Sequence, residues 1–237
     1  MPQSIFVTAL PRRTAILVFL TFAFAYFLSA LIRAITATLS PTLPQEFALN
    51  ASDLGLLAGG YFLGFAATQL PLGAWLDRHG PKKVILYFLA VAALGCVAFA
   101  FATSFPGLLV ARIFCGAGVS ACLMAPLTGY RRWFDASILM RVNSWMLMTG
   151  SLGMVASTLP VQWLMPLVGW RILFVALAVL VLIAMVLIAW RVPGWVGSVT
   201  QEHDPARTTP SYTEVWQHPY FRKMAPLGFF CYGGLVA

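Results

Sequence analysis

Long apolar runs alternate with short polar segments along most of the chain. Each run approaches the roughly 20 residues that an α-helix needs to cross the hydrocarbon core of a bilayer. Because lipid offers no partner to an open backbone amide, each run is expected to form a helix. The pattern predicts six transmembrane helices, at about residues 14–39, 54–76, 84–102, 107–128, 144–165 and 171–190.

The same pattern divides the chain into three regions. Residues 1–191 are expected to form a six-helix transmembrane bundle, and residues 192–223 a polar, proline-rich linker. Within the linker, Ser211 and Glu214 have the spacing of a capping box, which predicts a short interfacial helix. Residues 224–237 are apolar but too short to span a bilayer. They are expected to form an incomplete seventh helix, in which the chain ends.

Composition supports a membrane protein. Hydrophobic residues make up 60% of the chain and charged residues only 9%, whereas soluble domains contain roughly 25% charged residues. This excludes an ordinary soluble enzyme and indicates an all-α integral membrane protein. Cys96, Cys115, Cys122 and Cys231 all lie in apolar blocks, so neither a disulfide framework nor a metal site is expected.

The basic residues indicate the orientation in the membrane. The net charge of +8 comes from short Lys and Arg clusters between the apolar blocks, which favours contact with membrane lipid and argues against nucleic acid. The clusters fall in alternate loops, and the other loops contain only Arg171 as a cation. The positive-inside rule therefore predicts a multi-pass protein of the cell membrane with its N-terminus and linker in the cytoplasm.

Two arginines, Arg33 and Arg112, lie well within predicted spans, and no span contains Asp, Glu or His. A central arginine costs about 2.5–3.5 kcal/mol on insertion scales, so each needs compensating contacts. From the helical rise, both should lie roughly 8–9 Å below the outer boundary. They are therefore expected at the same depth, where they could face one another.

Polar residues repeat with helical spacing around Arg33, on a stripe that also contains Ser40. Such a stripe favours a water-filled substrate path, in which Arg33 attracts an anionic group of a small-molecule solute. The alternative for Arg33 is a reach toward outer headgroups or a bond to backbone carbonyls, and for Arg112 a hydrogen bond that packs helices. The predicted substrate-binding residues are Arg33, Tyr26, Ser29, Thr36 and Arg112.

Small residues recur on three of the predicted helices and favour close helix packing. They include Gly55, Gly59, Gly60 and Gly64 in the second helix, Gly116 and Gly118 in the fourth, and Gly150, Gly153 and Ser157 in the fifth.

The turn between the second and third helices has the most specific pattern, at residues 73–83. Gly80 permits a tight turn. Asp77 lies at a helix C-terminus, where a carboxylate is disfavoured by roughly 0.3–1 kcal/mol, so it should pair with a cation or with the N-terminus of another helix. The predicted cytoplasmic gate comprises Gly73, Asp77, Arg78, Gly80, Lys82 and Lys83, with Arg131 and Arg132 as candidate partners.

Residues 73–83 resemble the cytoplasmic signature of the major facilitator superfamily, G-x-x-x-D-R-x-G-x-[KR]-[KR], with Pro81 where a basic residue is frequent. The segment from Arg112 to Gly116 is similar to the family's R-x-x-x-G pattern, and residues 169–171 (Gly-Trp-Arg) to another. The resemblance implies a six-helix half built as a 3+3 inverted repeat, and transport by alternating access. It also implies that Asp77 latches the cytoplasmic side against a second six-helix half, which would be the missing partner.

Departures from the family pattern narrow the class of solute that the protein could carry. Met154 follows Gly153, unlike the Gly-Pro signature of the drug antiporters, and no span contains the carboxylate frequent in proton-coupled members. The position of Arg33 on the first helix is similar to that of an arginine in family members that carry organic anions.

A second function stays open: a stand-alone six-helix subunit that assembles or regulates other proteins without transport. An intramembrane enzyme would need a nucleophile with a base, or a metal cluster, and the spans contain neither. No enzymatic activity and no cofactor are expected.

Overall fold

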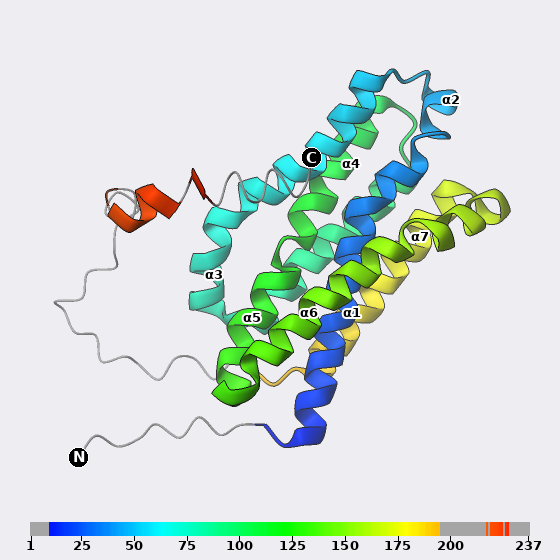
Figure 1. Cartoon of the computed structure of the whole chain (residues 1–237). Helices are drawn as coiled ribbons and strands as arrows, with labels where there is room; N and C mark the ends of the chain where they lie inside the picture. Colours follow the sequence, from blue (N-terminus) through cyan, green and yellow to red (C-terminus); the bar gives the residue numbers. More distant parts are fainter. Residues whose placement is uncertain (1–9, 195–216, 218, 225, 228–237) are drawn as a thin grey trace, which may run out of the picture. The chain divides into compact units, whose positions relative to one another are not determined.

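A computed structural model describes residues 10–194, 217, 219–224 and 226–227, and it forms two units that divide after Trp195. The described part of the first unit is helical without strands (Figure 1). Its helices are α1 (Arg12–Leu39), α2 (Leu43–Phe47), α3 (Ala51–Ala100), α4 (Phe105–Val119), α5 (Ala121–Trp133), α6 (Ala136–Ala156) and α7 (Leu159–Arg191). In the second unit, residues 219–224 are helical. The capping box at Ser211 and most of the seventh apolar block lie outside the described residues.

Helix α3 contains two of the predicted spans. Its 50 residues would extend about 75 Å as one straight helix, more than twice the roughly 30 Å of a hydrocarbon core. Gly80 divides it, with a φ of 76° and a ψ of 162° that only glycine adopts readily. The tight turn predicted at Gly80 is confirmed, and Pro81 begins the second arm without needing a hydrogen-bond acceptor for its nitrogen. We call residues 51–79 and 81–100 the first and second arms of α3.

The predicted fifth span, residues 144–165, is wrong as one continuous helix. Helix α6 ends at Ala156, and α7 begins at Leu159 after a non-helical Thr158. The cause is Pro160, which has no amide proton and whose ring would clash with the carbonyl four residues earlier. A second positive-φ glycine, Gly169 at 74°, then divides α7.

Among the described residues, four helical stretches are long and apolar enough to cross a membrane: Arg12–Leu39, Ala51–Ala100, Phe105–Trp133 and Leu159–Arg191. Helix α6 is not one of them, and Arg141, Asn143 and Ser144 make its first half polar. An all-α membrane protein is confirmed in class, and the count of six spans stays a prediction.

Glycines let α4 lie between the two arms of α3. A Cβ at Gly64 would meet the carbonyl of Ile113, and a Cβ at Gly116 would meet the carbonyl of Tyr61. On the other side of α4, a Cβ at Gly118 would meet the backbone of Ala92. Because lipid tails are as apolar as leucine, helices in a membrane associate through such close backbone contact. The predicted packing role is confirmed at these positions.

Helices α1 and α6 lie side by side (Figure 1) and pack in the same way. A Cβ at Gly150 would meet the ring of Tyr26, and a Cβ at Gly153 would meet the carbonyl of Phe27. Where α6 ends, the hydroxyl of Thr38 donates a hydrogen bond of 2.6 Å to the carbonyl of Ser157. The break between α6 and α7 is therefore fixed to α1.

We predict that Gly64→Ala destabilises the protein by about 1–3 kcal/mol, because the new methyl group must displace backbone rather than a flexible side chain. Gly59→Ala is the matched control. Gly59 lies in the same helix as Gly64, but a Cβ there would meet no atom within 4 Å. Thermal unfolding of the purified protein in detergent measures both. Equal unfolding temperatures for the two variants would contradict the close packing of α3 on α4.

Candidate functional site

Arg112 lies at the centre of the bundle, with 1% of its surface exposed. Its Nη1 donates a hydrogen bond of 3.0 Å to the carbonyl of Ile32, and its Nη2 one of 3.4 Å to the carbonyl of Arg33. The guanidinium carbon lies 5.1 Å from the ring centre of Tyr61 and 6.0 Å from that of Phe99. Carbonyl oxygens and ring faces replace water around the cation. The packing alternative left open for Arg112 is thus the arrangement observed, and a role in binding solute stays a prediction.

The bonds from Arg112 place it at the level of Arg33, as the depth estimate predicts. Arg33 itself is half-buried on α1, and its Nε is buried without an acceptor among the described residues. One turn along α1, the hydroxyl of Thr36 is also buried without a partner. The hydroxyl of Tyr61 and the Nε of Arg112 are also buried without a hydrogen-bond partner among the described residues.

These four groups are hydrogen-bond donors on α1, α3 and α4 for which the described residues provide no acceptor. Buried polar groups are normally paired, so unpaired ones need an explanation, such as a site for a ligand. We call this set, Arg33, Thr36, Tyr61 and Arg112, the donor cluster. Sequence reasoning missed Tyr61, because a tyrosine in an apolar block gives no signal until α3 is placed beside Arg112.

The other residues of the predicted stripe do not share one environment. Tyr26 is buried against Gly150 of α6, and Ser29 is buried inside the bundle. Ser40 is exposed and bonds back to the carbonyl of Ala37. The structure thus brings together Arg33, Thr36 and Arg112, while Tyr26 and Ser29 face α6 and the bundle interior.

At the Gly80 end of the bundle, a hollow of about 310 Å³ lies between α3 and α5. It is lined by Gln69, Leu72, Gly73, Leu76, Asp77, Met124 and Thr128. Asp77 is exposed and forms no ion pair within the described residues. Arg78, Lys83, Arg131 and Arg132 are exposed as well. The pairing of Asp77 with a cation stays a prediction.

Lys82 has a contact that the sequence does not reveal. Its Nζ donates a hydrogen bond of 2.7 Å to the carbonyl of Val192, the residue that caps the C-terminus of α7. A cation is favoured there, because the last carbonyls of a helix carry partial negative charge. Lys82 therefore ties the start of the second arm of α3 to the end of α7.

At the opposite end, Glu46 of α2 joins α7. Its carboxylate forms an ion pair with Arg171 and accepts a hydrogen bond of 2.6 Å from the indole nitrogen of Trp170. Arg171 also donates to the carbonyl of Ala102, at 3.3 Å. The sequence signal was present: Arg171 is the lone cation of those loops, and Glu46 is a carboxylate in one of them.

This cluster shifts the acidity of Glu46. Partial burial raises the pKa of its carboxyl group, but hydrogen bonds from Arg171 and Trp170 and the positive charge of Arg171 outweigh that effect. The pKa of Glu46 is therefore lowered from its usual 4.5. The charged form of Glu46 is the one that holds α2 on α7.

Comparison with known proteins agrees with this architecture. The sequence model of the Major Facilitator Superfamily matches residues 22–237. The chain belongs to this superfamily. This membership and the apolar helices indicate a multi-pass membrane protein.

Several curated transporters are similar to the chain. The 4-hydroxybenzoate transporter of Acinetobacter baylyi is 27% identical over 155 residues, which cover 65% of this chain and 34% of the relative. The hexuronate transporter of Escherichia coli is 28% identical over 148 residues, or 62% and 34%. The probable sulfoacetate transporter of Cupriavidus necator is 28% identical over 113 residues, or 47% and 26%. The chain thus spans about a third of the length of these curated relatives.

We predict that acid removes the stability contributed by Glu46. Because its pKa is lowered in the folded state, this contribution is complete above the unfolded pKa and disappears as pH falls through the folded pKa. The loss should be below about 1 kcal/mol, since the cluster is partly exposed. It is measured as the difference in unfolding temperature between wild type and Glu46→Gln, from about pH 7 to about pH 3.

The difference should shrink toward zero at the acid end of the series. Asp135→Asn, which removes a carboxylate outside this cluster, should keep the pH dependence of the wild type. A difference that stays constant over the whole series would show that the charge of Glu46 does not stabilise the fold.

Proposed function

We propose that the chain is part of a secondary active transporter that carries a small organic anion across the cell membrane by alternating access. The observation that carries this proposal is the donor cluster, in which two guanidinium groups and two hydroxyl groups have unpaired buried donors. Its charge is positive, and neither Arg33 nor Arg112 forms an ion pair with a carboxylate in the described part of the chain. An anionic solute would supply the missing acceptors.

Arg33 is the residue proposed to contact the solute. Both bonding Nη atoms of Arg112 are engaged by carbonyls of α1, whereas Arg33 is half-buried and its Nε has no acceptor. A guanidinium presents paired donors that match a carboxylate. The compounds in the names of the similar transporters, 4-hydroxybenzoate, hexuronate and sulfoacetate, are carboxylates at neutral pH. These names support the anionic class and leave the identity of the solute to experiment.

The described bundle would form one wall of the path, and a second six-helix half the other. The 3+3 inverted repeat is supported by Gly80 and Gly169, which have nearly the same φ and ψ. One adjoins Lys82 and its bond to Val192, and the other adjoins the Glu46 cluster. The hollow beside Asp77 would be the surface on which the second half closes the cytoplasmic side.

Uptake by Arg33 variants tests the proposal. In the full-length transporter, Arg33→Ala should abolish saturable uptake of organic carboxylates, a loss of at least roughly a hundredfold for a desolvated charge pair left incomplete. Arg33→Lys, which keeps the charge but not the paired donors, should retain part of the activity. Proteoliposome uptake of benzoates, uronates and sulfonates measures both variants.

A contrasting variant separates binding from stability. Arg33→Ala should keep the wild-type unfolding temperature, because the Arg33 side chain bonds no other described helix. Arg112→Ala should lower the unfolding temperature, because it removes the bonds between α4 and α1. Unchanged uptake by Arg33→Ala would reject the anion proposal.

Asp77 tests the alternating-access part of the proposal and the orientation. If Asp77 latches the cytoplasmic side, Asp77→Asn should favour the inward-open state and increase labelling of a cysteine introduced at Thr128, which lines the same hollow. Membrane-impermeant reagent should reach this cysteine in inverted vesicles and not in intact cells. Identical labelling rates with and without Asp77→Asn would exclude the latch, and labelling in intact cells would reverse the orientation.

A further inference from the structure

A second hollow, away from the donor cluster, lies between the start of α1 and the start of α6. Its volume is about 590 Å³, within the range of ligand sites. Its charged lining consists of Arg12 on α1, Arg141 on α6 and Asp135, which precedes α6. The rest of the lining is apolar or aromatic and includes Ile16, Phe19, Trp133 and Trp145.

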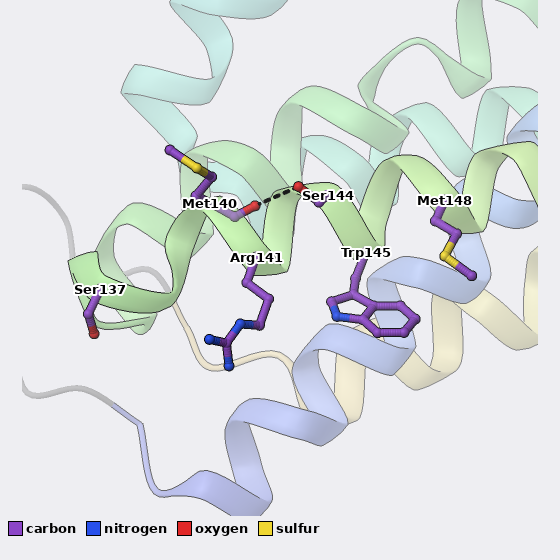
Figure 2. Close-up of a pocket in the computed structure, with 6 residues that line it drawn as sticks. All are labelled: Ser137, Met140, Arg141, Ser144, Trp145 and Met148. Atoms are coloured by element: carbon purple, nitrogen blue, oxygen red, sulfur yellow. Dashed lines mark hydrogen bonds between the residues drawn. The ribbon is translucent and has the colours of Figure 1, made fainter.

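The hollow continues along α6. Arg141 and Trp145 also line a neighbouring hollow of about 470 Å³, together with Ser137, Met140, Ser144 and Met148. Figure 2 shows Arg141, Trp145 and Met148 projecting from the same side of α6, as their spacing of four and three residues requires. We call the combined surface the α1–α6 groove, with Arg12 and Arg141 as its cationic end and Ile16, Phe19 and Trp145 as its apolar wall.

The groove lies where both helices change from polar to apolar. On α1, Arg12 and Arg13 precede the apolar residues 15–20. On α6, Arg141 is followed four and five residues later by Trp145 and Met146. Tryptophan is enriched at the level of lipid headgroups. Ile16 and Trp145, both large and apolar, are 49% and 53% exposed.

The charge of the groove selects among membrane components. Two guanidinium groups face one carboxylate, so the lining has an excess of one positive charge. Arginine binds phosphate oxygens through paired donors, and basic pockets between membrane helices on the cytoplasmic side bind anionic headgroups. A zwitterionic lipid carries its own ammonium group and would leave that excess charge unbalanced.

We propose that the α1–α6 groove binds one anionic phospholipid, with its phosphate between Arg12 and Arg141 and an acyl chain along Ile16, Phe19 and Trp145. The site is separate from the donor cluster, so its occupation does not depend on which solute is carried. A lipid held there contacts α1 and α6 together and favours the packing of Tyr26 on Gly150.

Native mass spectrometry of the full-length transporter tests this binding. The protein is delipidated and exposed to an equimolar mixture of phosphatidylglycerol and phosphatidylethanolamine with the same acyl chains. The wild type should retain phosphatidylglycerol in preference, and Arg12→Gln and Arg141→Gln should each weaken that retention roughly fivefold. Arg191→Gln, the same change at an exposed arginine at the end of α7, should retain the lipid as the wild type does.

Tryptophan quenching locates the lipid. Phosphatidylglycerol brominated on its acyl chain should quench part of the fluorescence at low lipid-to-protein ratio. Trp145→Phe should reduce that part, and the remainder should come from Trp133, which lines the same groove. Equal retention of the two lipids, no effect of Arg12→Gln and Arg141→Gln, or quenching that Trp145→Phe leaves unchanged would each overturn the proposal. In the last case the lipid lies elsewhere, and another part of the transporter is the candidate occupant of the groove.

Discussion

A permanently charged guanidinium in the apolar interior is the constraint around which the bundle is arranged. Arg112 forms no ion pair with a carboxylate in the described part of the chain. Its two Nη atoms bond carbonyls of α1, and the faces of Tyr61 and Phe99, one from each arm of α3, lie against the cation, while its Nε stays unpaired. One side chain therefore requires α1, α4 and both arms of α3 to meet at one level, and the unpaired donors of Arg33 and Tyr61 are gathered there as a result.

Close backbone contact makes this arrangement possible. Arg112 reaches the carbonyls of α1 only because α4 lies deep between the arms of α3, where Gly64, Gly116 and Gly118 leave room for backbone. In water, burial of apolar surface would hold such helices together, but lipid supplies no comparable force. The structure depends instead on contacts that fix helix positions closely. Binding groups on three different helices can then keep a defined geometry.

The sequence predicts the class of fold and much of its detail, because the signals are local. Hydrophobic length places the helices, and the turn at Gly80 follows from one glycine in a specific pattern. The break at Pro160 was overlooked because the surrounding block is apolar throughout, and hydropathy does not register the missing amide proton. The contacts of Tyr61, Lys82 and Glu46 were missed for another reason: their partners lie far away in the chain, so only the folded arrangement reveals them. That Arg33 and Arg112 lie at one level could be foreseen, whereas the bonding of Arg112 to backbone carbonyls depended on how closely α4 approaches α1.

The bends at Gly80 and Gly169 have a mechanical consequence. Each joins two long helical arms through one residue, and consecutive Cα atoms are only about 3.8 Å apart. There is no loop to absorb a displacement, so the arms on either side of each glycine cannot slide along the membrane normal independently. Lys82 at one joint and Arg171 at the other anchor these corners to neighbouring helices. A tilt of one arm is therefore passed directly to the arm on the other side of the glycine.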